Sequence, residues 1–288
     1  MHYAILVNPH AGRLSVDRKR AALSGAAALL NAPIHGLDTR TREDFMRCAR
    51  ELTEHCDVLV VAGGDGSVSD VINAIDTGCQ PIAYLPLGTG NALAHALRMR
   101  GPLTEGAKRI RNGSIRTYDL ISCDNKARAF MASVGIDGTI LNRIQRRRPA
   151  GRTGLHSYIG AAWMAFFRDY PRPVAHLSTD HTRTEVRSLL SLIVAKQPYY
   201  GFGMKVMPEA RFDDKRLHLR CIDATLVSAL WGGLSSFTIG NRSGRYMSGR
   251  QVTVHLDQAL LLQIDGNLAW KADHFSFAVL PQALKIKF

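Results

Sequence analysis

The stretch that decides the fold is "DVLVVAGGDGSVSD", residues 57–70, in which an apolar run ends in three glycines around one carboxylate. The apolar run predicts a buried strand, and residues 68–75 are predicted to form the helix that follows. Glycines permit positive φ and leave backbone N–H groups bare, so a phosphate can approach closely. Asp65, between the glycines, can hold Mg²⁺ beside such phosphates, directly or through water.

The same alternation of strand and helix covers the first part of the chain. Strands are predicted in "YAILVN", "PIHGLDT" and "PIAYLPLG", and helices over Val16–Leu30, Arg42–His55 and Asn91–Leu97. Continuous apolar strands between helices indicate a parallel, doubly wound sheet with both faces covered. Because ligands of such sheets bind beyond the carboxyl ends of the strands, the turns after Asn8, Ala62 and Leu87 are predicted to share one site.

After about Asp119 the pattern changes to short strand candidates, several of them alternating apolar and polar residues, with one helical stretch at Leu155–Phe167. Such alternation is typical of half-buried antiparallel strands. We therefore expect an α/β nucleotide-binding domain over residues 1–120 and a mainly antiparallel β domain over residues 121–275. The closing segment, residues 276–288, is expected to return to the first domain.

The composition favours anionic partners. Lys and Arg total 37 against 24 Asp and Glu, a formal net charge of +13. Such a charge suits nucleic acid, nucleotide phosphates or an acidic lipid surface, and does not choose among them. The run "RRRP" at residues 146–149 is interpreted as a solvated loop, so no nucleic-acid partner is expected.

Cysteine usage and apolar segments indicate a cytoplasmic protein. Five scattered cysteines without a Cys-x-x-Cys pair argue against a disulfide framework or a structural zinc site. The N-terminus begins with a strand-like run, so no signal peptide is expected. Apolar runs such as "SLLSLIVA" are shorter than the roughly 18 residues of a membrane span, so any membrane contact should be peripheral.

Two further loops resemble "GGDGS" in their chemistry. In "NPHAGR", residues 8–13, Gly12 allows close approach and Arg13 offers a fork of donors to a phosphate. In "PLGTGN", residues 86–91, Thr89 offers a hydroxyl and Asn91 caps the following helix or meets the nucleotide. Any one loop is also compatible with an ordinary turn, but three at successive strand ends predict a nucleotide site formed by Asn8, Gly12, Arg13, Gly63, Gly64, Gly66, Ser67, Gly88, Thr89 and Asn91.

Other phosphate-binding classes do not fit. The chain lacks the G-x-x-x-x-G-K-[ST] motif of P-loop enzymes. "GTGNAL" has Leu93 where the third glycine of a dinucleotide fingerprint is needed, which argues against a Rossmann dehydrogenase.

"NPHAG", "GGDGS" and "PLGTGN", in this order, resemble the diacylglycerol kinase catalytic domain family, which includes bacterial lipid kinases and sphingosine kinases. "FMASVGIDG", "YYGFGMKVMPEARFDDKRL" and "LQIDGN" extend the resemblance over nearly the whole chain. The resemblance implies ATP and Mg²⁺ as cofactors and transfer of the γ-phosphoryl group to a hydroxyl of diacylglycerol or a related lipid. It also implies that residues 121–275 form a β-sandwich that binds the lipid.

The resemblance assigns roles to four carboxylates. Asp65 would organise Mg²⁺ and the phosphates, and Asp119 and Asp265 match acidic positions around the reacting centre. Asp214 matches a loop that can hold a structural Mg²⁺. The alternatives are a strand-end cap for Asp119, a hairpin turn for Asp265, and solvated turn residues for Asp213 and Asp214.

Two departures from the family pattern bear on the chemistry. Lys215 stands where the family usually has glycine, which weakens the structural-metal interpretation. Asn267 stands where the family usually has the glutamate that takes the proton from the attacking hydroxyl. An amide cannot act as a general base near neutral pH, and that assistance is worth about 10²- to 10⁴-fold. Asn267 can still orient a hydroxyl, and Asp265 could act as the base instead.

The candidate lipid-binding segment is residues 155–167, whose apolar side chains are flanked by Arg152, Arg168 and Arg172. This pattern suits an acyl-chain cleft at an anionic bilayer, but core packing is the commoner explanation and the one we favour. His95 and His156 are interpreted as structural. If the chain oligomerises, a homodimer is expected.

Two rival functions remain open. The first is a kinase for a soluble substrate, such as an NAD kinase, since those enzymes share the Gly-Gly-Asp-Gly motif. The second is a catalytically weak nucleotide- or lipid-binding protein, which Asn267 suggests.

Overall fold

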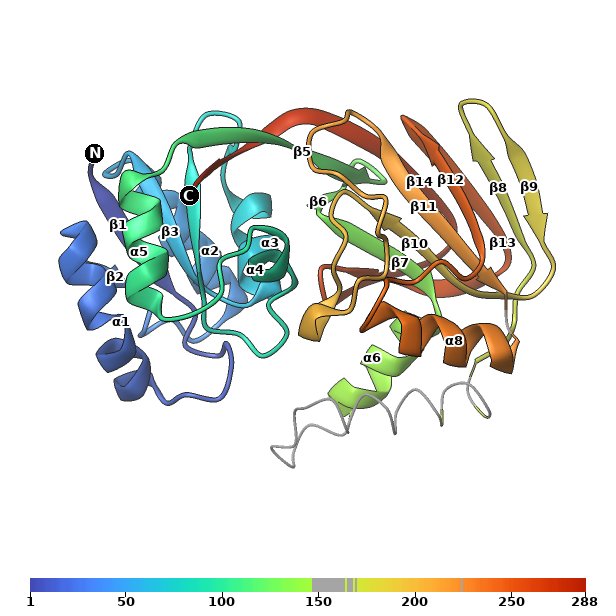
Figure 1. Ribbon diagram of the computed structural model, residues 1–288, viewed down its shortest axis with the longest axis horizontal. Helices are drawn as coiled ribbons and strands as arrows, with labels where there is room; N and C mark the ends of the chain where they lie inside the picture. Colours follow the sequence, from blue (N-terminus) through green and yellow to red (C-terminus); the bar gives the residue numbers. More distant parts are fainter. Residues whose placement is uncertain (147–163, 165–167, 169, 224) are drawn as a thin grey trace. The chain divides into compact units, whose positions relative to one another are not determined.

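The structure is a computed structural model that describes residues 1–146, 164, 168, 170–223 and 225–288 (Figure 1). The chain forms two compact units. The first contains Met1–Asp119 and Pro281–Phe288, and the second contains Leu120–Leu280. The last eight residues thus join the first unit, and each unit is described by itself below.

The first unit is the predicted α/β fold with a parallel sheet. Its strands have the order β14-β4-β3-β1-β2, and each neighbouring pair is parallel. Its elements are β1 (Tyr3–Val7), α1 (Val16–Leu30), β2 (Ile34–His35), α2 (Arg42–Thr53), β3 (Val58–Gly63), α3 (Asp65–Ala74), β4 (Ile82–Pro86), α4 (Ala92–Ala96), α5 (Leu103–Asn112), the start of β5 (Ile115–Cys123) and the end of β14 (Asn267–Lys287).

Sequence signals explain why these elements form. The central strands β1 and β3 are buried at every position, as expected for apolar runs covered on both faces. Thr41 and Asp44 form a reciprocal capping box at the start of α2, and Ser15 caps α1. Helix α1 packs against α5, and α2 packs against α3.

The strand order places a switch point between β1 and β3. From β1 the chain moves outward to β2, whereas from β3 it moves the opposite way to β4. Since such crossovers are right-handed, α1 covers one face and α2 and α3 the other. The crevice at the carboxyl ends of β1 and β3 is where ligands of open α/β sheets bind.

The second unit is antiparallel, as predicted. Its elements are the rest of β5, β6 (Ala127–Ala129), β7 (Met131–Gly135), α6 (Ile136–Arg146), β8 (Ala175–Thr179), β9 (Arg183–Val186), β10 (Leu189–Ala195), η3 (Gly201–Gly203), β11 (Leu217–Asp223), α8 (Leu226–Ser236), β12 (Arg245–Gly249), β13 (Gln251–Ile264) and most of β14. The main strand order is β12-β11-β10-β7-β13-β14, and β8 and β9 extend from β13.

Strand β13 connects two sets of strands within this unit. Its first part pairs with β8 and its last part pairs with β7. The register shifts between His255 and Leu260, which lets the strand change partners. The side chains between these strands form one apolar core that includes Leu192, Phe275 and Phe277.

Several boundaries differ from the predictions. Helix α3 begins at Asp65 rather than at residue 68. The N–H groups of a helix's first turn have no partner inside the helix, so the first turn can contain a glycine such as Gly66. One of the strand candidates after Asp119, "ARAFMASVGI" at residues 127–136, forms two strands divided at Phe130, and α6 begins at its last residue. Helix α8 was not predicted, since its glycines and serines have weak helix propensity. The predicted helix at residues 155–167 lies outside the described residues, apart from Met164.

Candidate functional site

The loops that follow β1, β3 and β4 lie against one another at the carboxyl end of the sheet. A side chain at Gly12, where φ is +67°, would overlap the carbonyl oxygen of Leu87. A Cβ at Gly88 would lie 2.5 Å from the Cα of Gly64. The glycines are therefore required for the close approach of the three loops, which the sequence predicted to share one site.

Asn8 joins the first loop to the second. Its Nδ2 donates to the hydroxyl of Ser67 at 3.0 Å, and its Oδ1 accepts from the backbone N–H of His10 at 2.9 Å. Ser67 is buried in the first turn of α3. The side-chain amide of Asn8 thus fixes the first loop against the start of α3 at the β1/β3 switch point.

Asp65 joins the second loop to the third. Its two carboxylate oxygens accept from the backbone N–H groups of Ala92 and Leu93, at 2.9 and 3.0 Å. Asp65 therefore supplies the cap of α4 from a distant part of the chain, and Asn91 makes no side-chain cap there. Burial raises the pKa of Asp65 and outweighs the hydrogen bonds from Leu93 and Ala92, which lower it.

Asn91 and Tyr84 complete the junction. Asn91 has a left-handed backbone, with φ of +46°, and its Nδ2 donates to the carbonyl of Gly88 at 2.8 Å. The buried hydroxyl of Tyr84 lies 3.0 Å from Asn91 Oδ1 and 3.2 Å from the carbonyl oxygen of Gly63. Burial raises the pKa of Tyr84 well above its ordinary value. Tyr84 was not predicted as a site residue because it occurs inside an apolar strand.

A buried lysine supports the first loop from behind. Lys19, in α1, is 1% exposed, and its Nζ donates to the carbonyl of Pro9. Burial lowers the pKa of this ammonium. The periodicity of α1 placed Lys19 on its apolar face, which was the one sequence signal that could have identified it.

Two predicted phosphate ligands lie exposed on the same loops. Arg13 and Thr89 make no side-chain hydrogen bond to any residue that the structure describes, and both are solvent-accessible. Gly66 lies in the first turn of α3 and is half-buried. These residues are available to a ligand, whereas Asn8, Asp65 and Asn91 are already bonded within the loops.

Asp119 lies in the middle of strand β5. It is 1% exposed within β5, and its Oδ1 accepts from the backbone N–H of Gln282 at 3.0 Å. Gln282 has φ of +54° in the segment that returns to the first unit. The carboxylate thus fastens this returning segment to β5, away from either end of that strand.

Asp265 and Asn267 belong to the second unit. Asp265 and Gly266 have φ of +47° and +89° and form the tight turn between β13 and β14, so the hairpin alternative describes the backbone of Asp265. Its carboxylate Oδ1 also accepts from the N–H groups of Phe130 and Met131, at 3.1 and 2.9 Å. Asn267 is half-buried, and its side chain has no hydrogen bond within the described residues.

Asp214, which was predicted to hold a structural metal ion, lies between two nitrogen donors. Its Oδ1 lies 2.6 Å from Lys196 Nζ, and its Oδ2 lies 2.7 Å from His218 Nε2. Burial by itself raises the pKa of Asp214, but its contacts with Lys196 and His218 outweigh burial and lower it. Across the described ranges, no group of three or more His, Cys, Asp or Glu side chains could hold a metal ion.

The sequence did not predict a polar cluster of the second unit, which contains Asp137, Ser191, Ser133 and Gln263. Asp137, in the first turn of α6, accepts a hydrogen bond from the hydroxyl of Ser191, and Ser133 donates to Gln263 Oε1 at 2.8 Å. Burial raises the pKa of Asp137 despite its hydrogen bonds to Ser191 and Ser133. Asp137 is the carboxylate of "FMASVGIDG", so that motif was the signal that could have identified it.

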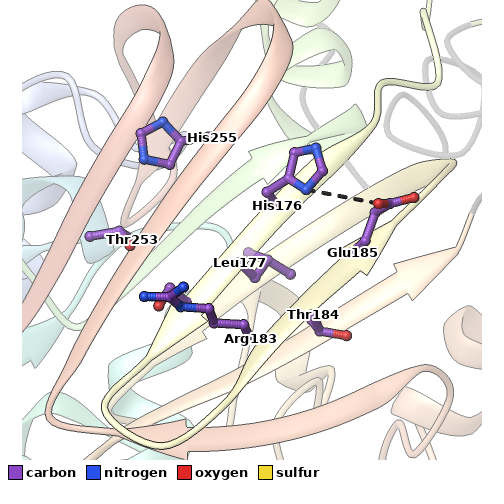
Figure 2. A pocket seen from close by; sticks show the side chains of 8 residues that line it. His176, Leu177, Arg183, Thr184, Glu185, Thr253 and His255 are labelled. Carbon is purple, nitrogen blue, oxygen red and sulfur yellow. Dashed lines mark ion pairs between the residues drawn. The ribbon is translucent and has the colours of Figure 1, made fainter.

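The second unit also has an open hollow over β8, β9 and β13, and Figure 2 shows its lining. An ion pair of 4.0 Å joins His176 to Glu185 across the two outer strands. None of the predicted site residues lines this hollow, whose members are His176, Leu177, Ser178, Arg183, Thr184, Glu185, Thr253 and His255. We therefore assign the hollow no part in the candidate site.

Comparison with known proteins identifies a family model for each unit. Residues 2–123 match the model of the diacylglycerol kinase catalytic domain. Residues 131–288 match the YegS C-terminal NAD kinase beta sandwich-like domain. The antiparallel second unit is thus a β-sandwich, as predicted.

Individual relatives are distant but cover most of the chain. The chain is 20% identical over 245 residues to "Putative lipid kinase SH2167" of Staphylococcus haemolyticus, which covers 82% of this chain and 78% of that protein. It is 18% identical over 305 residues to the "Putative lipid kinase" of Staphylococcus aureus strain Newman, covering 99% and 96%.

Solved structures show the same fold. The crystal structure of "a putative diacylglycerol kinase" from Bacillus anthracis has a TM-score of 0.79 at 18% identity, covering 100% of this chain and 96% of that one. An NAD kinase from Archaeoglobus fulgidus in complex with ATP has a TM-score of 0.53 at 14% identity, covering 100% and 94%. With its first unit matched by the diacylglycerol kinase catalytic domain and its second by the YegS C-terminal domain, the chain belongs to the family of kinases that joins these two domains.

Proposed function

We propose that this kinase transfers the γ-phosphoryl group of ATP to a hydroxyl of diacylglycerol or a related lipid. The observation that supports the proposal best is the contact among three glycine-containing loops at the β1/β3 switch point. Together with the start of α3, these loops present bare backbone amides, which suit the phosphates of a nucleotide.

The nucleotide would be held by two kinds of groups. Backbone N–H groups of Gly64 and Gly66 would bind phosphate oxygens, and the exposed Arg13 and Thr89 would add a guanidinium and a hydroxyl. Asn8, Asp65 and Asn91 would act mainly by holding these loops in place, since their side chains already bond within the loops. Phosphoryl transfer depends chiefly on such positioning and on charge stabilisation.

Mg²⁺ would enter with ATP and neutralise the charge that develops on the transferred phosphoryl group. Both oxygens of Asp65 accept a backbone N–H group, and each keeps a second lone pair. Asp65 therefore fits a water-mediated contact with the ion, and Mg²⁺ usually keeps several of its waters. Asp214 does not fit Mg²⁺, because its oxygens face Lys196 and His218.

The acceptor hydroxyl would be oriented by Asn267. Its side chain has no hydrogen bond within the described residues, so its amide is available to an acceptor. Asp265 is less suited to act as the base, because its carboxylate already binds the amides of Phe130 and Met131. We therefore propose that transfer proceeds slowly, without a strong general base at this position.

Contact with an anionic lipid surface is part of the proposal. The net charge of +13 favours such a surface. Large apolar side chains at the end of α8 and just after it are 49–68% exposed: Trp231, Leu234, Phe237 and Ile239. Lys205 lies beside Gly240, at the border of this group, and Arg242 is exposed two residues after Gly240. Among the described helices, none has the length and hydropathy to cross a bilayer.

The decisive experiment is a labelled-ATP assay across diacylglycerol, monoacylglycerol, sphingoid base, phosphatidylglycerol and undecaprenol presented in vesicles. Transfer to one of these lipids is expected. NAD and a sugar phosphate belong in the same assay, because the fold is shared with an NAD kinase solved with ATP. Transfer to a soluble acceptor alone would favour that second candidate, and tight ATP binding without transfer would favour a binding protein.

A further inference from the structure

A set of polar side chains, in which Lys196 and His218 are buried, links three neighbouring strands of the second unit. We call Lys196, Asp214, His218 and Tyr246 the Asp214 cluster. Lys196 follows β10, His218 belongs to β11 and Tyr246 to β12. His218 Nε2 lies 2.7 Å from Asp214 Oδ2, and His218 Nδ1 lies 2.8 Å from the hydroxyl of Tyr246.

Lys196 lies where a metal ion would be expected. Its ammonium is 0% exposed and donates to Asp214 Oδ1 at 2.6 Å and to the carbonyl of Arg216 at 2.7 Å. A carboxylate oxygen and a backbone carbonyl are typical ligands of Mg²⁺ and Ca²⁺. Here the same oxygens surround an ammonium.

The loop at residues 213–216 is shaped by these nitrogen donors. Lys215 has φ of +56°, a conformation that glycine adopts more readily. The N–H of Arg216 donates to Asp214 Oδ1 at 3.3 Å, so this oxygen accepts from both the ammonium and the backbone. Each carboxylate oxygen of Asp214 thus has a nitrogen partner from the chain itself.

We infer that the ammonium of Lys196 serves as the internal cation of the Asp214 loop, so that the second unit folds without a divalent ion at this position. The inference follows from packing and charge within the second unit. It holds whatever the protein phosphorylates, and its tests need neither nucleotide nor lipid.

Thermal unfolding of the unmodified protein without nucleotide is the first test. The melting temperature is expected to be the same in EDTA and in millimolar Mg²⁺, Ca²⁺ or Mn²⁺. A melting temperature that falls in EDTA and recovers with one of these ions would overturn the inference, provided that Asp214→Asn abolishes the response.

The second test is a gain of metal binding. Lys196→Ser removes the ammonium and leaves the Asp214 carboxylate, the Arg216 carbonyl and the His218 imidazole around the space, a mixed oxygen and nitrogen set suited to Mn²⁺. The variant is expected to melt at a lower temperature in EDTA and to regain several degrees with Mn²⁺, because an ion that binds only the folded state stabilises it.

Lys287→Ser is the matched control. Lys287 is 4% exposed and donates to the carbonyl of Gly113 at 2.6 Å. Its loss should lower the melting temperature without creating a response to Mn²⁺. If Lys196→Ser does not fold, Lys196→Met combined with Asp214→Leu removes both charges and should fold with no metal response. Recovery of that double variant by Mn²⁺ would contradict the inference.

Discussion

At the scale of single residues, Asp65 is a motif residue whose carboxylate holds two loops of the candidate site together. The sequence marks it as an acid beside phosphates, and the structure bonds both of its oxygens to the start of α4. Those two bonds fix the third loop relative to the second. A change at Asp65 should therefore alter the nucleotide site and the stability of the first unit together.

Asp65→Ala leaves the N–H groups of Ala92 and Leu93 without their acceptor. Loss of a helix cap costs about 0.5–2 kcal/mol of unfolding free energy. We expect that loss in urea denaturation, together with ATP affinity at least about tenfold weaker, which corresponds to about 1.4 kcal/mol of binding free energy. Isothermal titration with ATP and Mg²⁺ measures the second effect.

Asp44→Ala is the control for Asp65→Ala, because Asp44 closes the capping box of α2 with Thr41. It should lower stability by a comparable amount and leave ATP affinity unchanged. Equal affinities for ATP in both variants would show that Asp65 has no part in the nucleotide site.

Asn267 stands where the resemblance to the family implies a glutamate. Asn267→Glu places a carboxylate beside the turn at Asp265. If this residue meets the acceptor hydroxyl, turnover should rise, within the range of about 10²- to 10⁴-fold that general base catalysis supplies. Steady-state turnover with the best lipid acceptor measures the effect. Unchanged or lower turnover, with ATP affinity intact, would argue against a base role at this position.

At the scale of elements, the site depends on backbone contacts between loops that are separate in sequence. Gly12 and Leu87 meet across the first and third loops, and Gly64 and Gly88 meet across the second and third. Each contact excludes a Cβ atom. The three loops therefore form a unit in which a change in one should disturb all three.

Gly12→Ala tests this dependence between the loops. The substitution puts a Cβ against the carbonyl of Leu87 and imposes a strained φ of +67°. Backbone strain of this kind costs about 1–3 kcal/mol. We expect a loss of that size in the unfolding free energy and weaker ATP binding. Gly233→Ala, whose Cβ would meet open space in α8, is the control: it should leave ATP binding unchanged and should not lower the unfolding free energy, because alanine has the higher helix propensity.

The sequence predicted the elements whose signals are local. The apolar runs of β1, β3 and β4 and the helical stretches that form α1 and α2 need no distant partner to be recognised. Strand β14 was missed as one element, because it mixes charged residues with Pro281 and its pairing depends on distant strands. The contacts of Asp65 with Ala92 and of Asp214 with Lys196 were missed for a similar reason, since these partners lie 27 and 18 residues away.

At the scale of the whole molecule, the question is how a kinase of this family would reach a lipid acceptor. Two properties favour adsorption to an anionic surface, namely the net charge of +13 and the exposed apolar group at α8. Charge attracts the protein from a distance and is screened by salt, whereas apolar insertion is local and insensitive to salt. Vesicle binding should therefore have two components that can be separated.

Trp231→Ser combined with Leu234→Ser tests the apolar component. The two side chains are 60% and 68% exposed, so their replacement removes little packing from the fold. Burying each apolar side chain contributes about 1.5–3 kcal/mol, so the double variant should bind vesicles containing phosphatidylglycerol at least about tenfold more weakly. Sedimentation with vesicles in high salt isolates this component.

The control is Ile115→Ser, which replaces an apolar side chain of the first unit that is 40% exposed. It should leave vesicle binding unchanged. Trp231 gives an independent readout, because its fluorescence should shift to shorter wavelength when it enters the bilayer interface. If the double variant binds as tightly as the unmodified protein in high salt, α8 is not the inserted element, and the charge alone would account for adsorption.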